Sequence, residues 1–240
     1  MTDRDTGADG ATHGEGGFLA RLWKKLWTPA GSIALGTLLI GGFVAGIAFW
    51  GAFNWSLELT NTETFCRSCH EMENNVFEEY RTTIHYSNKS GVRASCPDCH
   101  VPREWVHKIA RKIRASNELY HHFLGTVSTR EKFQAKRLHL ATNEWRRMKS
   151  TDSRECRNCH KFDYMDYSAQ EPRASRIHQE ALTGGKTCID CHRGIAHQLP
   201  PNADEAYQKL VESMASKDNS MLTEYLKSVA PAAHAGQAGH

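Results

Sequence analysis

All eight cysteines of the chain lie in pairs separated by two residues, and a histidine directly follows each pair. These C-x-x-C-H motifs, numbered 1 to 4 along the chain, read CRSCH (66–70), CPDCH (96–100), CRNCH (156–160) and CIDCH (188–192). At this spacing two thiols add to the vinyl groups of one haem, and the histidine reaches its iron. The motifs therefore predict four covalently attached haem c groups. Their attachment residues are Cys66, Cys69, Cys96, Cys99, Cys156, Cys159, Cys188 and Cys191.

Three other chemistries use paired cysteines, and the repeated histidine separates them from the haem interpretation. Disulfides are common outside the cytoplasm, but they need no histidine after each pair. A tetrahedral zinc site takes two C-x-x-C units and gives no reason for a fixed histidine position. A thioredoxin-like redox pair needs one unit near a βαβ pattern, which the sequence lacks. Haem also explains why the chain is only 40% hydrophobic, because the macrocycles themselves supply apolar core.

The iron of a low-spin haem needs a second strong ligand, and further histidines can supply it. In motifs 2 to 4 the predicted iron ligands are His100, His160 and His192. His85 follows motif 1 by about the interval at which His178 follows motif 3, which favours both as distal ligands. The other candidates are His107, His121, His122, His139 and His197, whereas His13, His234 and His240 lie in the tails.

Motif 1 offers its iron two ligands, because the stretch FCRSCHEM contains both His70 and Met72. The other three motifs lack a methionine two residues after the histidine. A thioether ligand raises the potential of a haem iron relative to imidazole. Spacing alone leaves the choice between Met72 and His70 open.

The segment from Ile33 to Phe53 has no charged residue, and about 20 such residues span a bilayer as a helix. It is longer than the roughly 7–15 apolar residues of a cleaved signal peptide. Tryptophans at both ends suit the two membrane interfaces. We therefore expect an uncleaved transmembrane helix at 29–55. The interface residues are Trp23, Trp27, Trp50 and Trp55.

The basic residues Arg21, Lys24 and Lys25 precede this segment and place residues 1–28 in the cytoplasm by the positive-inside rule. We therefore expect a single-pass protein of the bacterial inner membrane, with everything after the helix in the periplasm. Glycines in the helix allow close approach of a second helix, so a homodimer and a monomer both stay open. The net charge of +3 is too small to indicate a nucleic-acid partner.

The predicted fold class is mainly α, with one N-terminal transmembrane helix and a periplasmic tetrahaem c domain at 56–200. The motifs fall in two pairs, which indicates two dihaem halves at about 60–125 and 150–200. Residues 104–124 and 130–148 read as helices, and 201–240 as a polar helix at 203–228 followed by a disordered tail. We interpret the basic face of the 104–124 helix as mostly solvated, in contact with anionic head groups. Its basic residues are Lys108, Arg111, Lys112 and Arg114.

These features resemble the NapC/NirT family of membrane-anchored tetrahaem quinol dehydrogenases. The resemblance covers about 20–200 and rests on the anchor, the four motifs, the form C-H-E-M at motif 1 and CIDCHRGIAHQLP at motif 4. It implies an all-α dihaem-repeat fold, oxidation of a membrane quinol near the first haem and a wire of haems to a soluble partner. The chain is most similar to the members that supply electrons to periplasmic nitrate reductase, which implies its catalytic and dihaem subunits as partners.

Two other functions stay open beside nitrate respiration. Other members of the family serve nitrite, N-oxide or S-oxide reductases. A terminal nitrogen-oxide reductase would need an iron with a vacant axial position. The spare histidines, however, are numerous enough to fill the second axial position of at least three haems. It would also have no use for a membrane anchor. The resemblance therefore favours an electron-transfer protein with quinol dehydrogenase activity.

The resemblance also assigns individual residues. In some members the methionine of C-x-x-C-H-x-M binds the first iron, which favours Met72 over His70. Those members place an acidic residue on the other side of the iron and a lysine at the quinone site. These positions match Glu118 and Lys112, although relatives often have Asp at the first. The family's distal histidines match the motifs TTIHYS, ELYHHFLG, ASRIHQE and GIAH, at His85, His122, His178 and His197.

Overall fold

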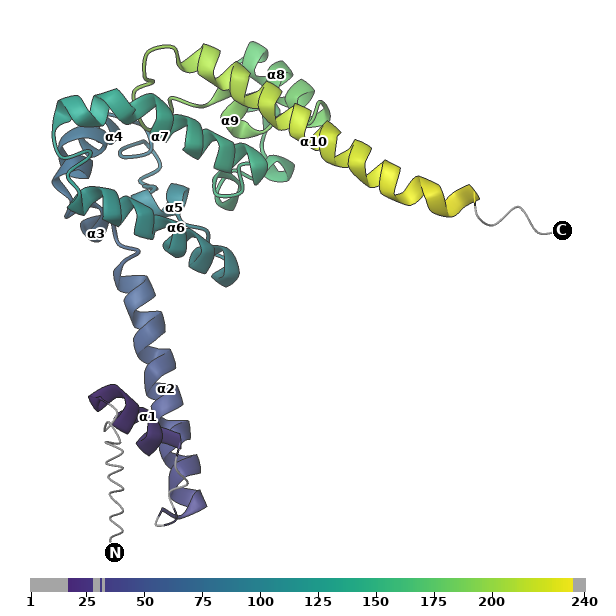
Figure 1. The fold of residues 1–240 in the computed structure, drawn as a ribbon. Coiled ribbons are helices and arrows are strands. Elements are labelled where there is room, and N and C mark those ends of the chain that lie inside the picture. Colours follow the sequence, from purple (N-terminus) through teal and green to yellow (C-terminus); the bar gives the residue numbers. More distant parts are fainter. Residues whose placement is uncertain (1–16, 28–30, 32, 235–240) are drawn as a thin grey trace, which may run out of the picture. The chain divides into compact units, whose positions relative to one another are not determined.

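The computed structural model describes residues 17–27, 31 and 33–234 of the 240-residue chain (Figure 1). Within these residues the regular structure is helical, with no β-strand, so the mainly α fold class is confirmed. The chain divides into an N-terminal unit, Met1–Trp55, and a C-terminal unit, Ser56–His240. The disorder predicted for the C-terminal tail falls partly on 235–240, which lie outside the described residues, as do 1–16.

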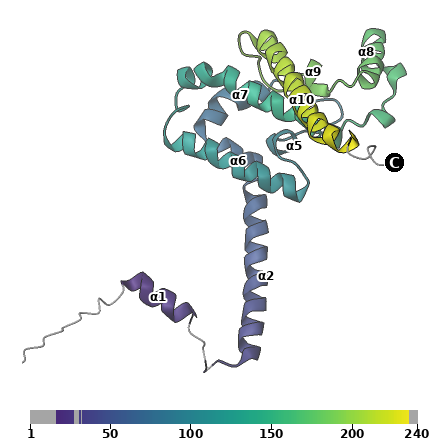
Figure 2. The ribbon, with the colours of Figure 1, turned by 45° about the vertical axis from the view of Figure 1, so that its right-hand side comes forward.

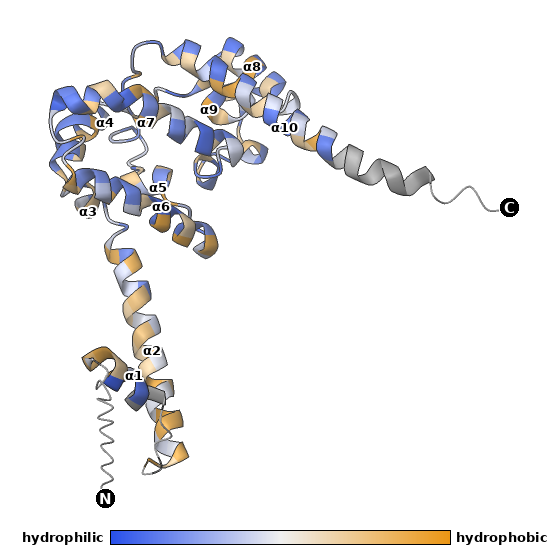
Figure 3. Ribbon diagram, viewed as in Figure 1, coloured by the Kyte–Doolittle hydropathy of each residue, from blue (hydrophilic) through white to orange (hydrophobic). Residues whose placement is uncertain are grey.

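The N-terminal unit contains α1 (Phe18–Trp27) and most of α2 (Leu35–Leu59). By length and composition α2 suits a membrane span, since its 25 residues extend about 37 Å at 1.5 Å per residue. Figure 3 shows its apolar colouring. An added Cβ at Gly41 or Gly42 would meet no atom within 4 Å. No contact among the described residues therefore requires these glycines, and the homodimer stays a prediction.

The C-terminal unit consists of short helical turns around the motifs and four long helices. The long ones are α6 (Trp105–Phe123), α7 (Arg130–Ser150), α8 (Pro172–Thr183) and α10 (Ala203–His234). α10 continues past the predicted end at 228. The short elements are α3 (Glu63–Arg67), η1 (Met72–Phe77), α4 (Glu78–Tyr80), α5 (Cys96–His100), η2 (Cys156–Asn158), η3 (Phe162–Tyr164), η4 (Tyr167–Ala169) and α9 (Cys188–Cys191).

Motifs 2 and 4 share a local structure that their sequences explain. Each opens a short helix with a capping box, Ser95 with Asp98 and Thr187 with Asp190. The shared pattern is S/T-C-x-D-C-H, in which the hydroxyl and the carboxylate satisfy backbone N–H groups at the helix start. Motifs 1 and 3 share C-R-x-C-H instead. This alternation is a signal for two related halves that the spacing of the motifs only suggested.

A side-chain core lies where α7, α9 and α10 meet, and Figures 1 and 2 show α10 alongside α7. The Tyr207 hydroxyl donates to Asp190 at 2.6 Å, and Lys149 Nζ donates to the same carboxylate at 2.8 Å. Burial alone would raise the pKa of Asp190, but these hydrogen bonds outweigh it and lower the pKa to about 2. Because Asp190 belongs to motif 4, the contacts of this core also hold motif 4 in place. Its buried residues are Trp145, Ile189, Ala203, Tyr207 and Leu210.

Three of the four basic residues of α6 turn towards the protein and only Arg114 is exposed, which corrects the interpretation of a mostly solvated face. Lys108 Nζ lies 2.7 Å from Glu58 Oε1, and Lys112 Nζ donates to the Thr60 carbonyl at 2.8 Å. Arg111 Nε donates to the carbonyl of motif 2's histidine at 3.2 Å. Free carbonyls and carboxylates near the motifs need donors, and this face of α6 supplies them.

Candidate haem sites

The structure places each motif histidine opposite one of the four predicted distal histidines. In each pair the ring centroids lie between 6.0 and 6.3 Å apart. Two of the pairs each form within a single predicted half, one pair in each half. The other two pairs each join a residue of the first half to a residue of the second. The pairs within a half are His70–His122 and His178–His192, and those between halves are His85–His160 and His100–His197.

This separation fits a metal ion held between two imidazoles. A nitrogen ligand lies about 2 Å from a metal such as zinc, and two rings bound at that distance from opposite sides have centroids about 6 Å apart. A haem iron at each motif would thus have one histidine from the motif and one from elsewhere in the chain. Within the described residues, no three His, Cys, Asp or Glu side chains gather as they would around a zinc ion. The donor set therefore fits haem.

The first cysteines of the two motifs in each half are neighbours. A hydrogen bond from Cys96 lowers the pKa of the Cys66 thiol to about 7. The same contact from Cys156 lowers the pKa of the Cys188 thiol to about 6. The two attachment points of each half are thus adjacent, and the arrangement repeats from the first half to the second.

His70 and Met72 occupy different surroundings. The ring of His70 faces His122, with centroids 6.1 Å apart. Met72 lines a cavity bordered by Cys66 of motif 1 and by the pair from motif 2, His100 and His197. Phe77 lines the same cavity. The arrangement favours His70 for the iron of motif 1, and it places the methionine between motifs 1 and 2.

In three of the paired histidines, Nδ1 lies within hydrogen-bond distance of a side-chain oxygen. Nε2 of the same ring is then left to bind a metal. Glu71 Oε1 lies 2.5 Å from His122, and Glu144 Oε1 lies 2.8 Å from His100. Gln170 Oε1 lies 2.7 Å from Nδ1 of His178. Such partners fix the tautomer and the ring orientation of a ligand. The sequence analysis did not identify these acceptors; only Glu71, directly after motif 1, had a local signal.

Burial tunes the charges at these sites. It lowers the pKa of His197 to about 4, which keeps the ring neutral, as a metal ligand must be. Burial alone would raise the pKa of Glu71, which is 6% exposed, but the hydrogen bond to His122, a backbone hydrogen bond and the nearby imidazoles together outweigh burial and lower the pKa. Motif 1 therefore has an ionised, buried carboxylate beside its distal histidine.

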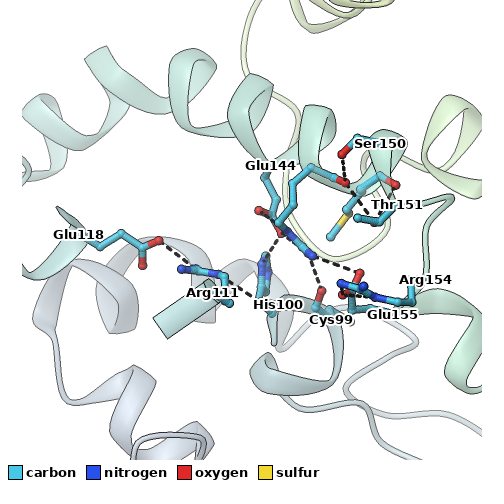
Figure 4. A network of polar contacts seen from close by, with 11 residues as sticks. Cys99, His100, Arg111, Glu118, Glu144, Ser150, Thr151, Arg154 and Glu155 are labelled. Carbon is cyan, nitrogen blue, oxygen red and sulfur yellow. Dashed lines mark hydrogen bonds and ion pairs between the residues drawn. The ribbon is translucent and has the colours of Figure 1, made fainter. Parts of the chain in front are cut away.

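Motif 2 is held by arginines from two helices, as part of the network in Figure 4. Arg111 on α6 donates to the His100 carbonyl, and Arg147 on α7 donates to the Cys99 carbonyl at 3.1 Å. Arg147 also pairs with Glu144 at 2.7 Å and with Glu155, whose side chain is 1% exposed, at 3.1 Å. A guanidinium group has enough donors to join these acceptors.

The structure does not bring the two quinol-site candidates together. Lys112 Nζ donates to the Thr60 carbonyl and hydroxyl, and burial lowers its pKa. Glu118, 63% exposed, pairs with Arg111 at 2.8 Å. Glu118 therefore contacts the residue that holds motif 2. The two candidates are six positions apart on the helix, which turns their side chains about 120° away from each other.

The remaining candidate histidines make polar contacts with side chains other than the motif histidines. Nδ1 of His121 lies 3.0 Å from the Thr126 hydroxyl. His107 lies 3.2 Å from Glu104, and His139 contacts Asn143. Of the adjacent pair on α6, only His122 faces a motif histidine.

A model of the NapC/NirT cytochrome c family, N-terminal region, matches residues 28–202. The chain belongs to this family. It is 58% identical over 184 residues to the cytochrome c-type protein NapC of Escherichia coli (strain K12), which covers 77% of the chain and 92% of the relative. It is 55% identical over 205 residues to the denitrification system component NirT of Stutzerimonas stutzeri, 85% of the chain and 98% of the relative.

A more distant member is the cytochrome c-type protein TorC of Escherichia coli (strain K12). It is 41% identical over 214 residues, 89% of the chain and 55% of the relative. No solved structure matches the chain. The family resemblance predicted from the motifs is confirmed, and with it a membrane-anchored c-type cytochrome.

Proposed function

We propose that this protein oxidises a membrane quinol and passes the electrons to a periplasmic reductase. The observation that carries the proposal is the set of four facing histidine pairs in one unit that continues from an apolar helix. Membership of the NapC/NirT family supports it. The positive-inside rule supports an orientation with the N-terminus in the cytoplasm and the haem domain in the periplasm.

We assign four bis-histidine haems. The motif cysteines attach the groups, and each motif histidine, His70 included, shares its iron with the distal histidine opposite. Bound haem supplies reversible one-electron chemistry. The chain's own task is to hold the rings, fix their tautomers through Glu71, Glu144 and Gln170, and exclude other ligands.

The facing pairs favour electron transfer over a terminal reductase. A reductase acting on a nitrogen oxide needs a vacant side on one iron, whereas each motif histidine has a histidine opposite. A quinol that is oxidised must also lose two protons to an acceptor. Glu118 and Lys112 stay the candidates near that site, and both lie on α6, the helix that carries His122.

We further propose periplasmic nitrate reductase, with its catalytic and dihaem subunits, as the electron acceptor. Greater identity to the relatives named NapC than to TorC supports this branch of the family. A different reductase, for nitrite, an N-oxide or an S-oxide, is the alternative. Co-purification of the detergent-solubilised protein with nitrate reductase, set against the other reductases, distinguishes them.

The test of the activity uses membranes that contain the holoprotein. A quinol analogue should reduce the haems, and Glu118→Ala should slow this reduction without loss of haem. Glu104→Ala, which removes another exposed carboxylate from the start of the same helix, is the matched control. A wild-type protein that quinol does not reduce would contradict the function. An unchanged rate in Glu118→Ala would remove only that residue from the site.

A further inference from the structure

α6 carries an apolar stripe that the protein leaves in solvent. Val106, Ile113 and Tyr120 recur every seven residues, nearly two helical turns, and so lie on one side of the helix. They are 69%, 68% and 59% exposed, and Phe123 on the next turn is 78% exposed. No residue of α6 is buried. A soluble protein rarely leaves four large apolar side chains this exposed along one side of a helix without a partner for them.

The stripe lies on the side of α6 away from the candidate haem sites. Arg111 and His122, which contact motif 2 and His70 respectively, are eleven residues apart and therefore share one side. Tyr120 is two residues from His122, about 200° around the helix. A haem between His70 and His122 would therefore leave the stripe uncovered.

The other side of α6 is tied to the point where the chain leaves its apolar helix. Lys108 pairs with Glu58 in the last turn of α2, and Lys112 donates to Thr60 just beyond it. These partners lie within five residues of Trp55, the aromatic residue at the end of the apolar segment. A membrane span that ends there brings α6 to the bilayer surface.

We propose that α6 lies in the membrane interface, with Val106, Ile113, Tyr120 and Phe123 among the lipids of the leaflet from which α2 emerges. A helix with one apolar face and one polar face binds a membrane in this way, and tyrosine suits the head-group level. The inference depends on the membrane anchor and not on quinol oxidation.

One consequence does rest on the proposed function. His122 would lie about one helix diameter, roughly 10 Å, from the lipid that bathes the stripe. A membrane quinol would then reach the site of motif 1 along α6, without crossing water.

The experiment uses the full-length holoprotein in lipid bilayers, with a nitroxide label at Ile113→Cys or Val106→Cys. The native cysteines are assigned to haem, so the new thiol is the one to label. Arg114→Cys, the next residue along and off the stripe, is the matched control. Collision of the label with oxygen, which concentrates in lipid, is compared with collision with a water-soluble nickel chelate. Haem content by absorbance confirms folding of each variant.

We expect the ratio of oxygen to nickel collisions to be high at positions 113 and 106 and to reverse at 114. A nickel-dominated ratio at all three positions would overturn the inference, since it places the stripe in water. A label at 113 that neither reagent reaches would also overturn it, because the stripe would then be covered by protein, either a second copy or the reductase. Quinol-driven reduction of the haems is recorded on the same samples. If quinol fails to reduce the haems, the collision ratios still test whether α6 lies in the membrane interface.

Discussion

The two long helices α6 and α7 are similar in length and follow each other in the chain, yet they present opposite faces to the protein. α7 buries Phe133 and Trp145 and packs against α10, as an amphipathic helix of a soluble protein does. α6 turns its basic face inwards, where it donates to motif 2 and to the end of α2, and leaves its apolar face exposed.

The difference follows from what each helix packs against. α7 borders a core of side chains, so burial of apolar surface holds it. α6 borders the backbone of motif 2 and the first histidine pair, which need hydrogen-bond donors and a ligand. Where prosthetic groups replace a side-chain core, the polar face can be the inner one.

The largest expected effect is a difference in unfolding free energy between a truncation in α7 and a truncation in α6. Trp145→Ala should lower the free energy of unfolding by about 3–5 kcal/mol, as large core truncations do. Ile113→Ala should change it by no more than about 0.5 kcal/mol in detergent, as for a surface residue. Denaturant unfolding of the solubilised holoprotein, followed by circular dichroism, measures both. Equal losses would mean that the stripe of α6 packs against protein.

A second prediction concerns acid stability at the buried pair between Arg137 on α7 and Glu79, 2.5 Å apart. Burial alone would raise the pKa of Glu79, but hydrogen bonds from Arg137 and the Gln198 amide outweigh it and lower the pKa. The stabilisation is therefore complete above the ordinary Glu pKa of about 4.3 and is lost as pH falls through the lower folded value.

Glu79→Gln should cost about 1.5–3 kcal/mol at neutral pH, the range for hydrogen bonds to charged groups. The loss should shrink on acidification, because the wild-type protein then loses the same contribution. Unfolding free energies of both proteins between neutral and acid pH measure this. A difference that stays constant with pH would mean that Glu79 is not ionised in the fold.

A smaller effect compares two contacts between a carboxylate and a histidine, one at each of the two helices. Glu71 bonds His122 on α6, whereas Glu144 on α7 bonds His100 and is also paired with Arg147. Glu71→Gln should raise the potential of the motif 1 haem by about 60 mV, a tenfold change for one electron. Glu144→Gln should raise that of motif 2 less, since Arg147 already offsets the charge. Spectroelectrochemical titration measures both, and the reverse order would contradict this reading of the charges.

From the sequence the candidate site could be described as a set of residues but not as an arrangement. The four motifs could be identified because haem attachment fixes residue type and spacing, whereas His122 and His197 were assigned through the family resemblance. The partners of His160 and His100 lie 75 and 97 residues away, and no local pattern determines such pairings. The periodicity of α6 identified the helix but not its inward face, since that depends on what the neighbouring motifs need. Glu144 carried no signal because it lies 44 residues from His100.

The most direct test of the account is the ligand set of the motif 1 haem. Near-infrared magnetic circular dichroism of the oxidised holoprotein distinguishes irons with two histidines from irons with a methionine ligand. We predict a bis-histidine signature for all four haems, unchanged in Met72→Leu, because His70 faces His122 while Met72 lines a cavity between motifs 1 and 2. A methionine-ligated band in the wild-type spectrum that disappears in Met72→Leu would contradict the account.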